Sequence, residues 1–368
     1  MLRHAHELAE SMVRMRRELH RHPELGFEEE WTANLVAERL AALGIDVRTG
    51  VGKTGVVGDL GRSGPRIALR ADMDALPIQE DNEVDYASEN PGVMHACGHD
   101  VHVACLLGAA ELLAGEEKAG RLQGRVRFLF QPAEEGQDSE GLSGAMRMVD
   151  EGVMDGVDAV VGLHVWTDLP AGAMSLREGA SSAFTDSFEL AITGKESHGA
   201  FPHNGFDAIA ISAQVVYALQ SLVSRRLDPT RAKVLSVGTI RGGTKENIIA
   251  GRVTMTGTIR TFDQDTRQDL FSELERAASV ARALGGNYEL SVKPGYVPVV
   301  NDPTLTSFVR QVGTDLLGED NVHESPLEMG GEDFSCFAEK APGCMSLLGG
   351  ELPGEPRRLH HHPRFDVD

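Results

Sequence analysis

The sequence predicts an α/β protein: a mainly parallel sheet flanked by helices, with a smaller α+β domain inserted into it. Three observations support this prediction. The chain has 368 residues, more than one hydrophobic core usually organises, so two domains are expected. Short apolar runs alternate with helical segments over most of the chain, as in parallel sheets covered on both faces. Residues 182–294 depart from that alternation.

The chain opens with two predicted helices. Apolar residues recur at helical spacing in the first of them: Leu8, Met12, Met15 and Leu19. The sequence His22-Pro23-Glu24 ends this helix. A second helix is expected from Glu29 to Leu43, where Gly44 suits the left-handed position after a helix end.

Buried parallel strands are expected next. Four short runs are mostly apolar and bounded by Gly or polar residues: 67–69, 126–130, 159–163 and 345–348. Strands buried on both faces have this composition. A helical segment from Val101 to Ala114 lies between the first two runs.

The inserted stretch has its own order of elements. Strands are expected at 187–193, 234–240, 252–260 and 288–293, with helices at 207–223 and 266–284. The order β-α-β-β-α-β is that of a small ferredoxin-like unit. We therefore expect a main domain of residues 1–181 and 295–368 and an inserted domain of residues 182–294.

The charge balance restricts the partners. The chain has 35 basic and 56 acidic residues, a formal net charge of −21, so it would repel nucleic acid and anionic membranes. No apolar stretch approaches the roughly 20 residues of a membrane span, and the first ten residues have no apolar signal core. The four cysteines suggest no disulfide framework, so a cytoplasmic protein is expected.

Residues with metal-binding side chains gather where the predicted strands end. Asp72 and Asp74 follow the first run and His164 follows the third. The segment 95–102 before the next helix contains three His, one Cys and one Asp, and thiolate and imidazole are preferred zinc ligands. If this segment is extended, Cys97 and His99 point the same way.

Two adjacent glutamates, Glu134 and Glu135, follow the second run. In extended backbone, neighbouring side chains face opposite sides, so one carboxylate could bind metal while the other moves protons. A pair of surface glutamates on a loop is the alternative. Near the end of the chain, the triplet His360-His361-His362 offers a further ligand, and Glu332 and Asp333 suit a loop beside the site.

These motifs together resemble the M20 metallopeptidase family, in its branch of aminoacylases, hippurate hydrolases and indole-acetyl-amino-acid hydrolases. The matching stretches cover nearly the whole chain in the expected order: 17–24, 70–77, 95–102, 131–136, 162–164, 197–205, 246–249, 329–335 and 361–363. The resemblance implies a zinc-peptidase-like main domain, and an insert that acts as a lid or dimerisation domain.

The resemblance also implies two divalent metal ions per subunit, zinc or manganese, with cobalt and nickel as alternatives. Five ligands carry over by position: Cys97, His99, Glu135, His164 and His361, with His99 or a water between the ions as the bridge. His361 is chosen because the family pattern is His, one residue, then Pro; a shift by one gives His360 or His362. Glu134 matches the general base, His198 a residue that reaches the partner subunit's site, and Asn247 and Arg260 positions that hold the substrate carboxylate.

The expected function is therefore hydrolysis of the amide bond of N-acyl amino acids by a homodimeric enzyme. A dipeptidase or carboxypeptidase of the same family is the first alternative, because the bond is similar. A non-catalytic protein stabilised by a structural metal is the second. Structural zinc sites usually close with four Cys or His ligands and have no spare base, which argues against it.

Overall fold

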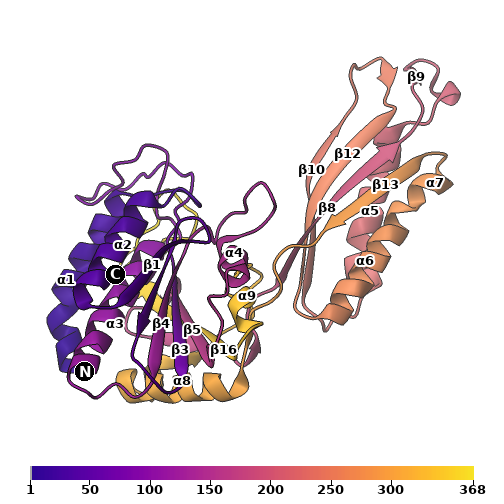
Figure 1. Cartoon of the computed structure of the whole chain (residues 1–368). Helices are drawn as coiled ribbons and strands as arrows, with labels where there is room; N and C mark the ends of the chain where they lie inside the picture. Colours follow the sequence, from indigo (N-terminus) through magenta and orange to yellow (C-terminus); the bar gives the residue numbers. More distant parts are fainter. Residues whose placement is uncertain (1) are drawn as a thin grey trace. The chain divides into compact units, whose positions relative to one another are not determined.

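The computed structural model describes residues 2–368, which fold as two compact units (Figure 1). The first unit contains the chain up to Ser181, together with Val299–Pro326 and Glu332–Asp368. The second contains Ser182–Pro298 and Leu327–Gly331. The first unit is therefore discontinuous in sequence, since the second interrupts it.

An eight-stranded mixed sheet forms the middle of the first unit. In spatial order the strands are β1 (Asp46–Val51), β2 (Gly55–Leu60), β4 (Arg125–Gln131), β3 (Arg66–Asp72), β5 (Ala159–Pro170), β16 (Gly343–Glu351), β6 (Met174–Leu176) and β15 (Val322–Glu324). The four central strands, β4, β3, β5 and β16, run parallel, and these are the four that the apolar runs predicted. The antiparallel strands β1, at one edge, and β2, between β1 and β4, were not predicted.

Helices cover both faces of this sheet. The helices α1 (Leu2–Arg21), α2 (Glu30–Leu43) and α3 (His99–Lys118) pack together on one face (Figure 1). The helices α4 (Gly144–Asp150) and α9 (Ser335–Ala338) contribute to the core on the opposite face. The helix α8 (Pro303–Leu317) packs against β6, β15 and β16. Successive residues of β4 show why two layers form: Phe128 and Phe130 enter the core under α1–α3, while Leu129 enters the other core.

The second unit is a four-stranded antiparallel sheet with helices on one face. Its elements are β8 (Phe184–Thr193), α5 (Ala208–Arg225), β10 (Lys233–Gly242), β12 (Arg252–Thr261), α6 (Gln264–Ala278), α7 (Val280–Ala283) and β13 (Asn287–Lys293). The spatial order β10-β12-β8-β13 is that of a ferredoxin-like fold. The predicted helix 266–284 is divided into α6 and α7 at Ser279, which ends the first and begins the second.

Several short elements complete the chain. A two-stranded ladder of β9 (Ser197–His198) and β11 (Ile248–Ile249) lies in the second unit and was not predicted. The strands β7 (Gly179–Ala180) and β14 (Val300–Asn301) pair in the first unit, and two 3-10 turns occupy Pro202–Asn204 and Glu319–Asn321. Within residues 2–368, none of the helices combines the length and the apolar character that crossing a membrane requires. The predicted fold class, a mainly parallel sheet flanked by helices, is confirmed.

Candidate metal centre

The candidate donor residues of the first unit come from four separated segments of chain. Cys97 and His99 lie at the start of α3, Glu134 and Glu135 in the turn after β4, and His164 in β5. The predicted strand 159–163 placed His164 after its end. The strand β5 extends to Pro170, so His164 lies inside it. His361 lies in a turn after β16.

A left-handed glycine joins Cys97 to His99. Gly98 has φ 91°, which a residue with a Cβ adopts only at a cost. A Cβ built on Gly98 would also lie 2.2 Å from Val165 Cγ1, so the helix can start this close to β5 only with glycine here. The segment from Cys97 to His99 is therefore not extended, so the expectation that an extended backbone directs both side chains the same way is wrong.

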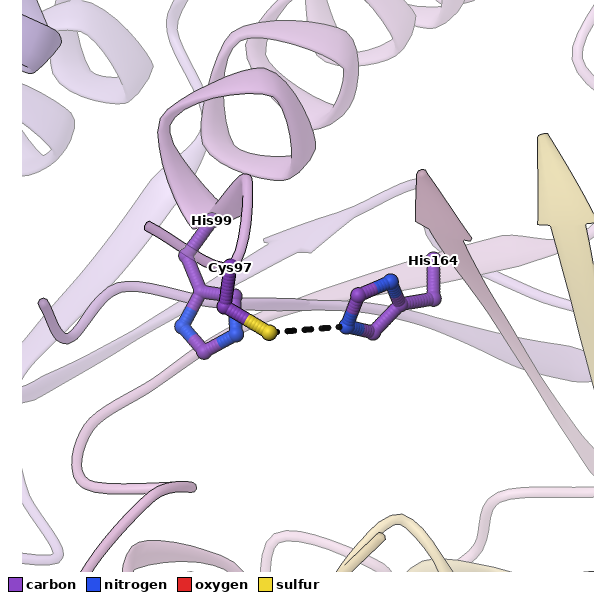
Figure 2. A group of neighbouring side chains, drawn as sticks. All are labelled: Cys97, His99 and His164. Atoms are coloured by element: carbon purple, nitrogen blue, oxygen red, sulfur yellow. Dashed lines mark hydrogen bonds between the residues drawn. The ribbon is translucent and has the colours of Figure 1, made fainter. Parts of the chain in front are cut away.

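The side chains themselves nevertheless converge. Cys97 Sγ lies 3.4 Å from His164 Nε2, and Figure 2 shows the imidazole of His99 beside this pair. One ligand atom from each of Cys97, His99 and His164 lies within 4.8 Å of the other two. Cys97 and His99 are buried and His164 is half-buried, so the group forms a compact site.

Further groups of donors overlap the first one. Cys97 also belongs to a group with Glu135 and His361, and His361 Nε2 lies 2.8 Å from Glu135 Oε1. His99 belongs to a group with Glu134 and Glu135. Both Cys97 and His99 recur among the groups, so the structure offers two adjacent positions for a cation with shared donors.

The three consecutive histidines have different surroundings. His361 has φ 59° and faces Glu135. His360 is stacked on Trp166, with ring centroids 4.7 Å apart, and its Nε2 lies 3.0 Å from the Val165 carbonyl. His362 Nδ1 accepts a hydrogen bond from the Arg364 amide. Only His361 of the three belongs to a donor group with Cys97 and Glu135.

Glu134 lies in different surroundings from Glu135. Its carboxylate is grouped with Glu332 and Asp333, and the buried Arg70 guanidinium donates to both of these acids, at 2.9 Å and 3.2 Å. Burial and then the charges of Glu332, Glu135 and Asp333 raise the pKa of Glu134 well above its usual value, although Arg70 opposes them. A carboxyl with a raised pKa can hold and release a proton near neutral pH.

The divergence of the two glutamates does not come from an extended strand. Ala133, the residue before them, has φ 41°, so the chain turns immediately after β4. The Ala133 amide donates to Glu29 Oε1 at 2.8 Å, and the Glu135 amide donates to Asp74 Oδ2 at 2.9 Å. The two glutamates are therefore separated by a held turn and not by the alternation of a strand.

Two aspartates, Asp72 at the end of β3 and Asp74 just after it, form a second layer around the donors. Asp74 Oδ1 lies 3.2 Å from His99 Nδ1. Asp72 Oδ1 lies 2.6 Å from His102 Nδ1, and His102 Nε2 accepts from the Val165 amide at 2.8 Å. Carboxylates that orient imidazoles in this way are common behind metal ligands. His102 is thereby occupied on both ring nitrogens, so it serves to hold β5 beside His164.

The donor set fits divalent cations. One thiol, three imidazoles and one carboxylate are ligands that zinc and similar metals accept. His99 Nε2 is buried without a hydrogen-bond partner among the described residues, and its nearest carboxylate oxygen, on Asp72, is 3.5 Å away. Burial and then the charge of Glu135 raise the pKa of the Cys97 thiol. A bound cation would satisfy the imidazole and reverse the effect on the thiol.

The remaining predicted residues belong to the second unit. His198 is exposed in β9, and its Nδ1 accepts from the Ala200 amide at 3.0 Å. The exposed Asn247 lies beside it, because its carbonyl accepts from the Gly199 amide at 2.7 Å. Arg260 is half-buried in β12 and donates to the Ile259 carbonyl at 3.0 Å.

Sequence reasoning missed the residues that hold the donors in place. Arg70 could have been suspected, because a charged residue inside an apolar strand needs buried partners. His102 was noticed only as part of the ligand cluster. Glu29 had no signal, since it stands in the acidic run Glu28-Glu29-Glu30, which has the composition of an exposed surface.

Comparison with known proteins gives the same family over most of the chain. The sequence profile of peptidase family M20/M25/M40 matches residues 68–368. The chain is 40% identical to the N-acetyl-L-cysteine deacetylase of Bacillus subtilis over 98% of its own length and 84% of that protein. It is 41% identical to thermostable carboxypeptidase 2 of Saccharolobus solfataricus, over 93% of its own length and 86% of that protein.

A solved structure agrees with these relatives. The Bacillus subtilis YXEP protein, described as a dinuclear metal-binding peptidase of the M20 family, superposes with a TM-score of 0.83 at 36% identity. The match covers 97% of this chain and 92% of that one. The chain therefore belongs to peptidase family M20/M25/M40 and is a hydrolase, as its motifs predicted.

Proposed function

We propose that the protein hydrolyses the amide bond of N-acyl amino acids at a centre of two divalent metal ions. The proposed ligands are Cys97, His99, Glu135, His164 and His361. The observation that carries this proposal is that two consecutive carboxylates, which have His99 as a common neighbour, otherwise have different surroundings. Glu135 lies against Cys97 and His361, while Glu134 lies against Glu332 and Asp333, where its pKa is raised.

In this proposal Glu134 is the general base and then the general acid. When bound, the two ions would polarise the substrate carbonyl and lower the pKa of a water from about 15.7 toward 7. The Glu134 carboxylate takes the proton of that water and later delivers it to the departing amino group. Burial and then the neighbouring acids raise the pKa of this carboxyl, and Arg70 opposes them.

The roles of the second unit in the proposal come from the family resemblance. His198 would reach the partner subunit's site and donate to the developing oxyanion. Asn247 and Arg260 would hold the carboxylate of the substrate. The ladder of β9 and β11 supports this assignment, since it places His198 and Asn247 next to one another on an exposed surface.

Two relatives favour two different classes of substrate. The likeness to an N-acetyl-L-cysteine deacetylase favours a small acyl group on an amino acid. The likeness to a carboxypeptidase favours the second candidate, cleavage of a short peptide at its C-terminal residue. Both reactions would use the same metal centre and the same base.

We also propose a homodimer formed through the second unit, in the cytoplasm. The edge strand β10 has an unpaired side, and Tyr217 and Ile240 are 74% and 56% exposed. All four cysteines are free thiols, which suits a reducing compartment. Light scattering that gives the mass of one chain would contradict the dimer, and recovery from the periplasmic or secreted fraction would contradict the location.

The test of the function starts from protein stripped by a chelator. It is reloaded separately with zinc, manganese, cobalt or nickel and assayed for release of free amine from N-acyl amino acids and dipeptides. We expect hydrolysis only after reloading, with two ions per chain measured by elemental analysis. The best substrate then chooses between amidohydrolase and peptidase. Activity that survives complete removal of metal would contradict the proposal.

A further inference from the structure

The turn that presents Glu134 and Glu135 begins with a backbone conformation that alanine rarely adopts. Ala133 has φ 41° and is fully buried. For a residue with a Cβ, the left-handed region is unfavourable, because the Cβ approaches the following carbonyl oxygen. Contacts elsewhere in the structure must offset this cost, since nothing in the local sequence favours it.

Both polar groups of the Ala133 backbone are held from other segments. Its amide donates to Glu29 Oε1 at 2.8 Å, and its carbonyl accepts from the Gly144 amide at 3.0 Å. The far side of the turn is tied as well, because the Glu135 amide donates to Asp74 Oδ2. The bond between Glu29 and Ala133 is the one that fixes the entry to the turn.

Glu29 is an unusual group to find in this place. It is fully buried, and it forms no ion pair with a basic side chain among residues 2–368. Its second carboxylate oxygen accepts from the Thr54 hydroxyl. Burial and then the charge of Asp74 raise its pKa to about 7, while its hydrogen bonds act in the opposite direction. Burying a carboxyl is expensive, so its retention points to a specific task.

Space around the turn is shaped for the same conformation. A Cβ built on Gly26 would lie 2.9 Å from Ala133 Cβ and 3.1 Å from Ala133 Cα. Gly26 and Glu29 belong to the same short segment between α1 and α2. This segment therefore provides both the room for the Ala133 side chain and the acceptor for its amide.

We propose that Glu29 is a positioning residue: its carboxylate holds the Ala133 peptide in the left-handed conformation that directs Glu134 and Glu135 to their separate surroundings. This inference rests on the proposed function for the roles of those two glutamates. Glu29 belongs to none of the groups of possible metal ligands found among residues 2–368. What matters is the reach of its acceptor oxygen to the Ala133 amide, and its negative charge is dispensable.

Two substitutions separate reach from charge. Glu29→Gln keeps the length and an acceptor oxygen for the Ala133 amide, and its NH2 can donate to the Thr54 hydroxyl. Glu29→Asp keeps the charge but is shorter by one methylene. We expect the Gln variant to stay within about 3-fold of the wild type in kcat, because its geometry is kept. We expect the Asp variant to lose about 10- to 100-fold in kcat with little change in KM, since small misplacements of a reacting group are costly.

Metal affinity gives a readout that does not need a substrate. Zinc titrated calorimetrically into the chelator-treated full chain should bind about 10- to 100-fold more weakly to the Asp variant, because Glu135 is misdirected. The Gln variant should bind zinc as the wild type does. If the wild type binds zinc but hydrolyses no substrate, the proposed function fails, while the zinc titration still decides the role of Glu29.

Glu24→Asp is the matched control. Glu24 belongs to the same segment, but its carboxylate accepts from the Trp31 and Thr32 amides at the start of α2, at 2.9 Å each. The same shortening should lower the thermal midpoint and leave zinc affinity and kcat per folded molecule unchanged. The inference is overturned if Glu29→Gln is impaired as much as Glu29→Asp, if neither variant is impaired, or if Glu24→Asp weakens zinc binding equally.

Discussion

The two groups of candidate functional residues are held in opposite ways. In the first unit the donors are backed by buried side chains, as when Asp74 contacts His99 and accepts from the Glu135 amide. In the second unit His198 stands exposed on a two-residue strand and accepts a single bond from Ala200. The first arrangement fixes geometry through a network, whereas the second leaves a side chain free to move.

This difference predicts in which part of the molecule a substitution affects both activity and stability. Changes to the buried bonds around the donors of the first unit should alter stability and activity together, because the same bonds serve both. Changes at the exposed residues of the second unit should alter activity alone. The four predictions that follow test this separation, from the largest expected effect to the smallest.

Replacement of the proposed base should have the largest effect. Glu134→Gln removes the group that takes and returns the proton, so kcat should fall by about 10³-fold or more. The variant should retain two metal ions per chain, because its ligands are intact. Steady-state kinetics and elemental analysis check both statements. Turnover near that of the wild type would show that another group is the base.

Removal of the buried Arg70 guanidinium should have the largest effect on the free energy of unfolding. Arg70→Gln leaves Asp72, Glu332 and Asp333 buried without their cation, which should lower the free energy of unfolding by about 3–5 kcal/mol. Chemical denaturation measures this change. The matched control is Arg252→Ala, which removes the exposed pair with Glu289 and should cost less than about 1 kcal/mol. Equal losses would erase the contrast between the two units.

Stability should depend on pH through His20. Burial lowers the pKa of this ring, but the hydrogen bond and charge of Asp100 more than offset it and raise the pKa from 6.5 to about 9. Because the folded-state pKa is the higher one, this stabilisation is fully present below pH 6.5 and is lost as the pH rises through 9.

The size of that contribution is about 3 kcal/mol from the shift alone. His20→Gln should therefore be less stable than the wild type at pH 6, and the two should converge above pH 9. Denaturation curves at fixed metal content check this. A difference that stays constant from pH 6 to pH 10 would mean that His20 does not change its protonation in this range.

Replacement of His198 should have the smallest effect on stability, although it should lower kcat. His198→Ala should lower kcat by about 10²-fold, because one donor to the oxyanion is lost. The thermal midpoint and the metal content should not change, since the side chain is exposed and makes one hydrogen bond among residues 2–368. A fall in the thermal midpoint comparable to that of Arg70→Gln would contradict the separation of roles.

Much of the architecture could be predicted because it is encoded by local pattern. The apolar runs gave the four central parallel strands, and the order of elements in residues 182–294 gave the ferredoxin-like sheet. The edge strand β1 escaped because Asp46–Val51 is largely exposed and its sequence lacks a clear alternation. Short ladders such as β9 with β11 depend on tertiary contacts and leave no periodic signal.

The candidate site was predictable in its donors but not in its support. Possible metal ligands can be recognised from their residue type, and the ends of parallel strands bring such residues together. The supporting bonds of Glu29 and His102 end on backbone amides, those of Ala133 and Val165, which no sequence pattern marks. The left-handed turn at Ala133 was equally hidden, because alanine is not a residue that signals such a conformation.

The discontinuity of the first unit has a consequence for the order of synthesis. Four of the five proposed metal ligands, from Cys97 to His164, are translated before the insert begins at Ser182. His361 is translated only after residues 182–298 have been made. Domains generally fold as the ribosome releases them, so the second unit can fold while its host still lacks a donor. A nascent chain stalled before His361 would therefore lack one of the five proposed ligands. The complete set of ligands would be present only after the first unit has been synthesised to His361.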